Sequence, residues 1–127
     1  MKDKDIVRWK GGKFGAVYEG GVADIPAKVN RGLAVHKTID HYGGEMEGQY
    51  GISHIASGYS LSGKHIYESQ RDAIVVADIM LERLKDVDWT LDQQALIAKY
   101  HDLGNRVSEI LNAELFEVIV TPIENAN

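Results

Sequence analysis

The sequence contains no cysteine, which removes disulfide bonds, thiolate metal sites, cysteine nucleophiles and thiol redox chemistry. Its 127 residues are enough for one domain with a hydrophobic core and too few for two. Stability must therefore come from packing, with oligomerisation as a further source. We predict a single domain over residues 1–127.

Long apolar runs are also missing. No stretch approaches the roughly 18 consecutive apolar residues that indicate a transmembrane helix, and the charged start has no signal-peptide hydrophobic region. We therefore expect a soluble protein that is not exported, that lies in the cytoplasm and that has no membrane partner.

Positive charge is scarce. The chain has 14 Lys and Arg against 19 Asp and Glu, which gives a formal net charge of −5. An acidic chain has no general attraction for a nucleic-acid backbone, so we expect no nucleic-acid partner. Two or three cations in one pocket, binding a small anion, remain compatible with this charge.

Patterns for metal binding and catalysis are missing as well. The five histidines do not show the spacing of four on a helix, or of two on a strand, that a metal site needs. Ser53 and His54 are neighbours, and neighbours on a strand point to opposite faces. We expect no metal, no cofactor and no enzymatic activity. An acid–base role for loop carboxylates stays open, although solvated charge is their ordinary state.

Glycines divide the first half of the chain into short runs typical of strands joined by turns. In the run Gly32–Ile39, Leu33 and Val35 alternate with Ala34 and His36, which favours a half-buried antiparallel sheet. We interpret Gly11-Gly12 as a hairpin turn and Gly20–Arg31 as an irregular connection. The predicted strands are Ile6–Trp9, Phe14–Glu19, Gly32–Ile39, Tyr50–Ile55 and Tyr59–Ile66, and the last of them is either continuous or broken at Ser62-Gly63.

Two amphipathic helices are predicted over residues 69–113. Ser69 and Thr90 each begin a capping-box pattern, with an acidic residue close behind. In the second helix, apolar residues recur at spacings of four and three. This seam packs either on the chain's own sheet and first helix or on another subunit. The seam residues are Leu96, Tyr100, Leu103, Val107 and Ile110.

The C-terminal residues Leu115–Thr121 are β-branched and apolar, and they predict a last strand before Pro122. From Val107 onward there are four Glu and no Lys or Arg, whereas the first thirteen residues hold five basic and two acidic side chains. These ends could pair within or between subunits, or simply be solvated. The fold class we predict is α+β: a mainly β part over 1–66, two helices over 69–113 and this strand.

The second predicted helix contains an unusual glycine, Gly104. Glycine inside a helix costs about 0.8–1 kcal/mol relative to alanine, and close approach of a backbone or a ligand is a common reason for it. Nearby, Tyr100 offers a ring for a base, Asn105 an amide for a base edge and Arg106 a guanidinium for phosphate. The alternative is that Tyr100 packs in the core and Arg106 is solvated.

Two further cations are candidates for anion binding. Arg31 precedes a strand, where its side chain is free to reach a pocket or a neighbouring subunit. Lys37 falls on the mostly apolar face of that strand, which is unusual unless an anionic group meets it. The alternative for both is that the aliphatic stem lies along the sheet edge with the charge in water.

The order of these elements resembles a known family. The features are the run Ile52–Tyr59, the helix from Ser69, the break at Asp88–Thr90 and a long helix with Asn105-Arg106. Over roughly residues 5–113 the chain is similar to the type-one Thoeris anti-defence proteins of phages, which sequester a cyclic ADP-ribose signal. The likeness rests on size and layout rather than on a diagnostic motif.

This resemblance implies an α+β fold, a non-enzymatic sponge and a homo-oligomer with nucleotide pockets between subunits. Arg31 and Arg106 would bind phosphate, with Asn105 and an aromatic ring, Tyr100 or Trp89, at the base. The ligand would be a cyclic ADP-ribose isomer or a cyclic dinucleotide, bound in the host bacterial cytoplasm.

Our hypothesis is a non-catalytic phage anti-defence protein that sequesters such a nucleotide. The alternative is a small phage inhibitor that docks on a host defence protein such as a nuclease. A small hydrolase or cyclase would require a catalytic group assembled only in the fold. The candidate ligand-binding residues are Arg31, Lys37, Trp89, Tyr100, Asn105 and Arg106.

Overall fold

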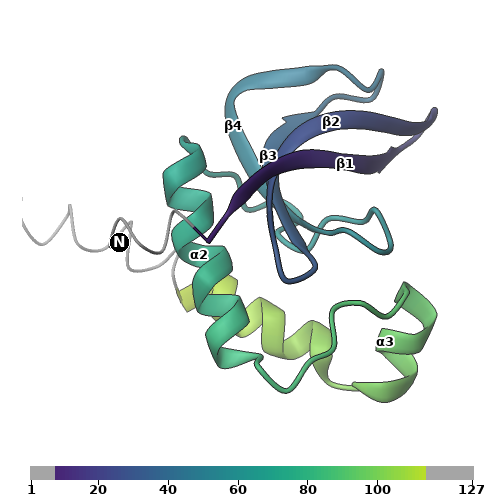
Figure 1. Cartoon of the computed structure of the whole chain (residues 1–127), viewed down its shortest axis with the longest axis vertical. Coiled ribbons are helices and arrows are strands. Elements are labelled where there is room, and N and C mark those ends of the chain that lie inside the picture. Colours follow the sequence, from purple (N-terminus) through teal and green to yellow (C-terminus); the bar gives the residue numbers. More distant parts are fainter. Residues whose placement is uncertain (1–7, 114–127) are drawn as a thin grey trace, which may run out of the picture.

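The computed structural model describes residues 8–113, and the predicted strand at 115–121 lies outside them. An antiparallel four-stranded sheet in the order β1-β2-β3-β4 is followed by helices, so the α+β prediction is confirmed (Figure 1). The elements are β1 (Lys10–Tyr18), β2 (Gly21–Asn30), β3 (Leu33–Ile39), β4 (Glu45–His54), α2 (Gln70–Arg83), α3 (Gln93–Lys99) and a helix over 103–113.

The first two strands form one long hairpin, and this corrects two predictions. Gly11 and Gly12 lie inside β1 rather than in a turn, and the segment predicted as an irregular connection is β2. Pro26 lies inside this segment and pairs with Lys13 in the β1–β2 ladder. The β2–β3 ladder covers only Lys28–Asn30, so at Pro26 β2 has a neighbour on one side, and proline is tolerated in strands with such an open side.

Two other predicted strands differ from the structure. Of Ile6–Trp9, only Arg8 and Trp9 are described, and they precede β1. The segment Tyr59–Ile66 is not a strand but runs along the outer edge of β4. Single bridges join Ser60 to Ser53 and Tyr67 to Tyr50 there. Turn glycines such as Gly63, at φ +55°, interrupt any regular ladder along this segment.

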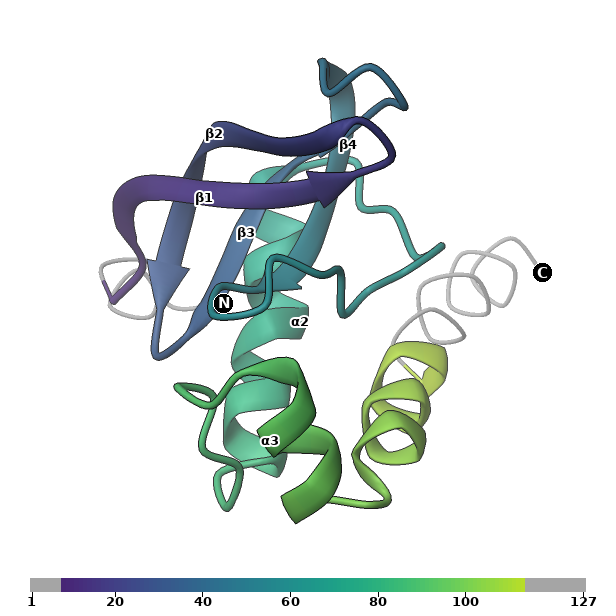
Figure 2. The ribbon, with the colours of Figure 1, turned by 90° about the vertical axis from the view of Figure 1, so that its right-hand side faces the viewer.

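Both faces of β3 are buried, which the sequence pattern did not predict. Leu33 and Val35 pack with Ile52 against the helices, in the main core. Ala34 packs on the opposite face with Phe14 and Ile25 in a second, smaller core. The sheet curls so that the β1–β2 hairpin covers this second face (Figure 2).

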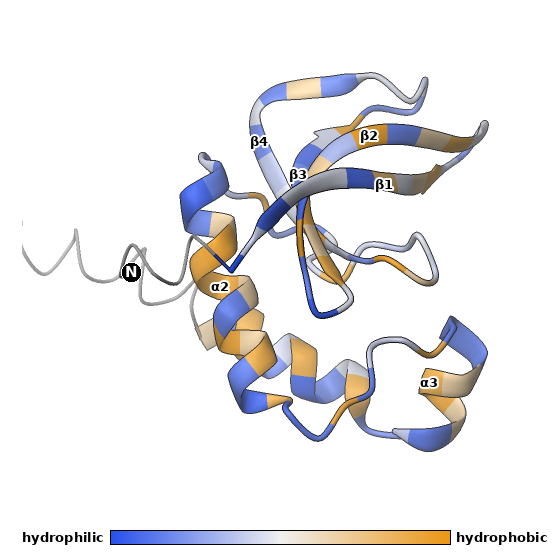
Figure 3. Ribbon diagram, viewed as in Figure 1, coloured by the Kyte–Doolittle hydropathy of each residue, from blue (hydrophilic) through white to orange (hydrophobic). Residues whose placement is uncertain are grey.

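Helix α2 begins as predicted at the Ser69 cap, whose hydroxyl accepts a hydrogen bond from the backbone N–H of Asp72 at 3.1 Å. The helix packs on β3 and β4, with Ala73, Ala77 and Met80 completely buried. Apolar residues recur along α2 and along the helix of 103–113, separated by hydrophilic ones (Figure 3). This pattern is typical of helices with one buried side.

The second predicted helix is divided in two. Asp92, rather than Thr90, caps α3 by accepting from the N–H of Ala95, and the chain leaves the helical conformation at Tyr100. Residues 101 and 102 form a turn before the helix of 103–113. The break lets Leu96 before it and Leu103 and Val107 after it all reach the main core.

Candidate functional site

The turn between β2 and β3 carries one of the predicted ligand residues. Asn30 pairs with Leu33, and the two residues between them, Arg31 and Gly32, have φ angles of +51° and +92°. Positive φ at both central residues defines a type I′ turn, in which Asn and Gly are the preferred residues. Arginine in this conformation costs about 1–2 kcal/mol, so the turn itself does not require a guanidinium.

The turn is held against the loop that follows α2. A Cβ added at Gly32 would lie 2.7 Å from the Cβ of Trp89, so only glycine fits there. The Gly32 carbonyl accepts a hydrogen bond from the N–H of Ile55 at 3.0 Å. Buried His54 joins the same segments, with Nε2 2.7 Å from the Trp89 carbonyl and Nδ1 2.8 Å from the Ser57 hydroxyl. The position of Arg31 is therefore fixed by tertiary contacts.

A cavity of about 440 Å³ lies between this turn, the start of β1 and the second half of α2. Three arginines and two carboxylates line it, which leaves one net positive charge in a chain with a net charge of −5. The lining residues are Arg8, Asn30, Arg31, Asp78, Ile79, Leu81, Glu82 and Arg83.

The polar side chains that line this cavity differ in the hydrogen bonds and ion pairs that they make within the chain. Asp78 accepts a hydrogen bond from the indole N–H of buried Trp9 at 2.8 Å. Arg31 is exposed, and within residues 8–113 its guanidinium has no ion-pair partner. Arg31 is therefore the cavity arginine best able to take up an external anion.

A second cavity, of about 400 Å³, is lined by residues of all four strands and by Gln70 at the start of α2. Lys37 is one of its lining residues. The Lys37 ammonium donates to Glu47 at 2.7 Å, and this hydrogen bond raises the pKa of Lys37. The sequence pattern predicted that an anionic group meets Lys37, and Glu47 of the chain itself is that group. Binding of an external anion by Lys37 would have to compete with Glu47.

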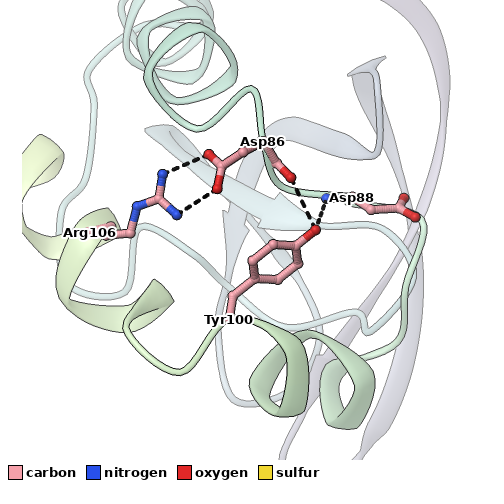
Figure 4. A network of polar contacts seen from close by, with 4 residues as sticks. All are labelled: Asp86, Asp88, Tyr100 and Arg106. Atoms are coloured by element: carbon pink, nitrogen blue, oxygen red, sulfur yellow. Dashed lines mark hydrogen bonds and ion pairs between the residues drawn. The ribbon is translucent and has the colours of Figure 1, made fainter.

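Two other predicted ligand residues, Tyr100 and Arg106, form a network with the loop after α2 (Figure 4). Arg106 donates to both carboxylate oxygens of Asp86, at 3.0 and 2.7 Å. The Tyr100 hydroxyl donates to the Asp86 carbonyl at 3.1 Å and accepts from the N–H of Asp88 at 2.9 Å. The hydrogen bonds from Arg106 hold the pKa of the Asp86 carboxyl below its usual value.

The remaining predicted residues do not join these two in one pocket. Trp89 is 4% exposed and belongs to the main core, where its ring is covered. Asn105 is exposed on the last helix. A Cβ at Gly104 would meet nothing within 4 Å, so no described backbone approaches this glycine closely. Of the six candidates, Arg31 alone lines the cavity of about 440 Å³.

Sequence reasoning missed Arg8 and Arg83, which the fold brings to the Arg31 cavity from distant parts of the chain. A lone arginine before a strand and another in the last turn of a helix carry no local signal of a shared site. The one available signal was Arg31 itself, which lies in the turn between β2 and β3.

Ser53 and His54 point to opposite faces of β4, as expected for neighbours on a strand. Ser53 lies 2.7 Å from Nε2 of His36 on one face, while His54 reaches Ser57 and Trp89. The Nδ1 of His36 is 2.7 Å from the Lys37 carbonyl, so Nδ1 carries the proton and Nε2 accepts from Ser53. Ser53 is 2% exposed, so its hydroxyl is not accessible to a substrate.

Within residues 8–113, no group of three or more His, Asp or Glu side chains is placed to hold a metal ion. None of the helices described is both long enough and apolar enough to cross a membrane.

Comparisons with known proteins found no match among protein-family models, curated proteins or solved structures.

Proposed function

We propose that this protein binds a small phosphate-bearing ligand without converting it, in the cavity between the Arg31 turn and α2. The observation that carries the proposal is that three arginines line one cavity of about 440 Å³ in an acidic protein. Guanidinium groups bind phosphate through two parallel hydrogen bonds, and such pairs are stronger than those of neutral donors.

The cavity favours a small ligand over a polymer. Its volume falls within the range of about 300–1,000 Å³ that is typical of small-molecule sites. Asp78 and Glu82 on the same wall would repel the next phosphates of a long polyanion, and they offer acceptors to ligand hydroxyl groups. A compact molecule with one or two phosphates and a ribose meets these conditions.

In its specific form, the proposal is that the protein sequesters a cyclic nucleotide immune signal in the bacterial cytoplasm, as a homo-oligomeric phage anti-defence protein. This form is supported by the resemblance to the Thoeris anti-defence family and by the gathered arginines. Sequestration requires tight binding and no turnover. The inaccessible Ser53 hydroxyl agrees with a binding role.

The second candidate, docking on a host defence protein such as a nuclease, is favoured by a different observation. Large apolar side chains are exposed around the β1–β2 hairpin and the loop after β3, with Val22 at 65% and Tyr42 at 80%. Exposed apolar residues that lie close together are typical of protein-binding surfaces.

The two candidates are separated by a ligand screen. Purified protein is mixed with cyclic ADP-ribose isomers and cyclic dinucleotides, its melting temperature is measured, and bound ligand is recovered after heat denaturation. Intact ligand supports sequestration. A cleaved product would assign the protein to an enzyme class, and the absence of a shift with every nucleotide would favour the protein-docking candidate.

The site is tested with two variants that remove the same charge from different places. Arg31→Gly removes the guanidinium and fits the positive φ of the turn, so the fold is retained. We expect it to weaken binding about tenfold or more, whereas Arg106→Gln, outside the cavity, leaves affinity within about twofold. Loss of binding in Arg106→Gln but not in Arg31→Gly would place the ligand at the Asp86 network instead.

A further inference from the structure

The outer edge of β1 is open along its first half. β1 is an end strand of the sheet, and the N–H of Val17 points away from β2, to the Gly58 carbonyl at 3.0 Å. Backbone groups alternate along an antiparallel strand, so Lys13 and Gly11 direct their N–H and C=O groups outward as well. Within residues 8–113, no strand lies beside them.

The opposite edge of the sheet is covered. Along β4, Tyr50 exchanges two backbone hydrogen bonds with Tyr67, and the Ile52 carbonyl accepts from the N–H groups of Leu61 and Ser62. Proteins usually cover, shorten or charge their edge strands because unpaired backbone groups attract other strands. The contrast between the two edges makes β1 the place where this sheet can accept another strand.

The open stretch of β1 offers little steric resistance. A Cβ at Gly11 would meet nothing within 4 Å, and Lys10, Gly11, Gly12 and Lys13 are all exposed. The two lysines make the edge positive, although the whole chain is acidic. An added strand should therefore be apolar or β-branched and carry negative charge.

We propose that residues 115–121 of a second copy of this chain add to the open edge of β1 as an antiparallel or parallel fifth strand. The segment Leu-Phe-Glu-Val-Ile-Val-Thr is rich in β-branched and aromatic residues, which favour strands. Glu117 is the one charged residue of the segment, and Glu114 directly precedes it, so the charge of the segment is opposite to that of Lys10 and Lys13.

The arrangement of the helices favours a second copy over the same chain. Figure 2 shows α2 between the beginning of β1 and the helix of 103–113. A helix with its side chains is about 10–12 Å across. Only residue 114 separates 113 from the segment, so residue 115 lies at most about 7 Å from residue 113. The segment of one chain therefore cannot pass around α2 to its own β1.

Exchange of this segment between two copies closes the assembly. Each copy gives one strand and accepts one, as a twofold-symmetric dimer requires, so the open stretch of β1 is paired in both copies. No residue that lines the arginine cavity lies in the open stretch of β1, so a monomeric protein would contradict the homo-oligomer of the specific proposal but not ligand binding in the cavity.

The first test compares two substitutions at Gly11 in the full chain. Gly11→Pro removes the outward N–H, whereas Gly11→Ala keeps it, and a Cβ fits at this position. By light scattering after size exclusion, we expect a dimer for the wild type and Gly11→Ala and a monomer for Gly11→Pro. A monomeric wild type, or a dimer that persists both in Gly11→Pro and after removal of residues 114–127, would overturn the proposal.

The second test identifies the occupant of the edge and does not depend on Gly11→Pro folding. Since the chain has no cysteine, single cysteines can be placed without background. Chains with Gly11→Cys are mixed with chains with Val118→Cys and treated with a short bismaleimide. We expect a crosslinked heterodimer. A chain that carries both Gly11→Cys and Val118→Cys is treated in the same way. If it is crosslinked within one chain and forms no crosslinked dimer, the strand is not exchanged.

Discussion

Arg106 holds the Asp86 carboxylate with both terminal nitrogens, at 3.0 and 2.7 Å, and so ties the helix of 103–113 to the loop that follows α2. The Asp86 backbone carbonyl also accepts a hydrogen bond from the Tyr100 hydroxyl. Asp86 thus accepts hydrogen bonds from Tyr100, at the end of α3, and from Arg106, in the helix of 103–113. Tyr100 and Arg106, which were proposed from sequence as part of a nucleotide site, thus join the helical segments.

This pairing predicts a coupling between Arg106 and Asp86 that depends on salt. Both side chains are partly exposed, at 28% and 55%, so the ion pair is screened by solvent. Arg106→Gln and Asp86→Asn should each lower the melting temperature slightly, and the double variant should lose less than the sum of the two. The coupling should shrink in 1 M NaCl. Additive effects at low salt would contradict the contact.

Buried His36 predicts a loss of stability in mild acid. Burial lowers the pKa of its ring below the ordinary value of 6.5, so the unfolded chain takes up this proton more readily than the folded one. The stability that His36 contributes is complete above pH 6.5 and is lost as the pH falls through 6.5 toward the lower pKa of the folded protein. Urea unfolding between pH 8 and pH 5 measures this slope.

The matched variants for this measurement are His36→Gln and His101→Gln. His36→Gln should flatten the fall in unfolding free energy below pH 6.5, because a glutamine does not take up a proton. His101→Gln replaces an exposed histidine by the same residue and is the control for the substitution itself. Equal slopes for the wild type and His36→Gln would contradict the assignment.

Gly32 predicts a large effect for the smallest substitution. An alanine there must adopt a φ of +92° and place its Cβ 2.7 Å from the Cβ of Trp89. Gly63→Ala is the matched control, with a φ of +55° and open space around the Cβ. We expect Gly32→Ala to cost about 2–4 kcal/mol of unfolding free energy and Gly63→Ala about 1 kcal/mol. Equal losses would show that Trp89 does not restrict the turn.

Ser62 predicts the cost of leaving a buried backbone donor unpaired. Its hydroxyl, in a side chain that is 2% exposed, accepts from the Ile52 N–H at 3.0 Å. Ser62→Ala should lower the free energy of unfolding by about 1–3 kcal/mol. Exposed Ser60 accepts from the Gly63 N–H, where water can replace it, so Ser60→Ala should cost less in the same chemical denaturation experiment.

The sequence predicted the elements whose signals are local. The capping-box pattern at Ser69 placed the start of α2, because a helix cap depends on residues a few positions apart. Strand β3 followed from its run of apolar residues between turn residues. The candidate site could be predicted only at Arg31, which lies in the turn before β3.

Tertiary contacts decided the rest. Pro26 remained in β2 because pairing with β1 outweighed the local preference against a strand, and the second helix broke at Tyr100 because residues on both sides of it pack into one core. The cavity is formed by Arg8, Arg31 and Arg83, which are far apart in the sequence. Residues that are neighbours in the sequence determine helix caps and turns. A site made by residues far apart in the sequence forms only when the whole chain packs into its fold.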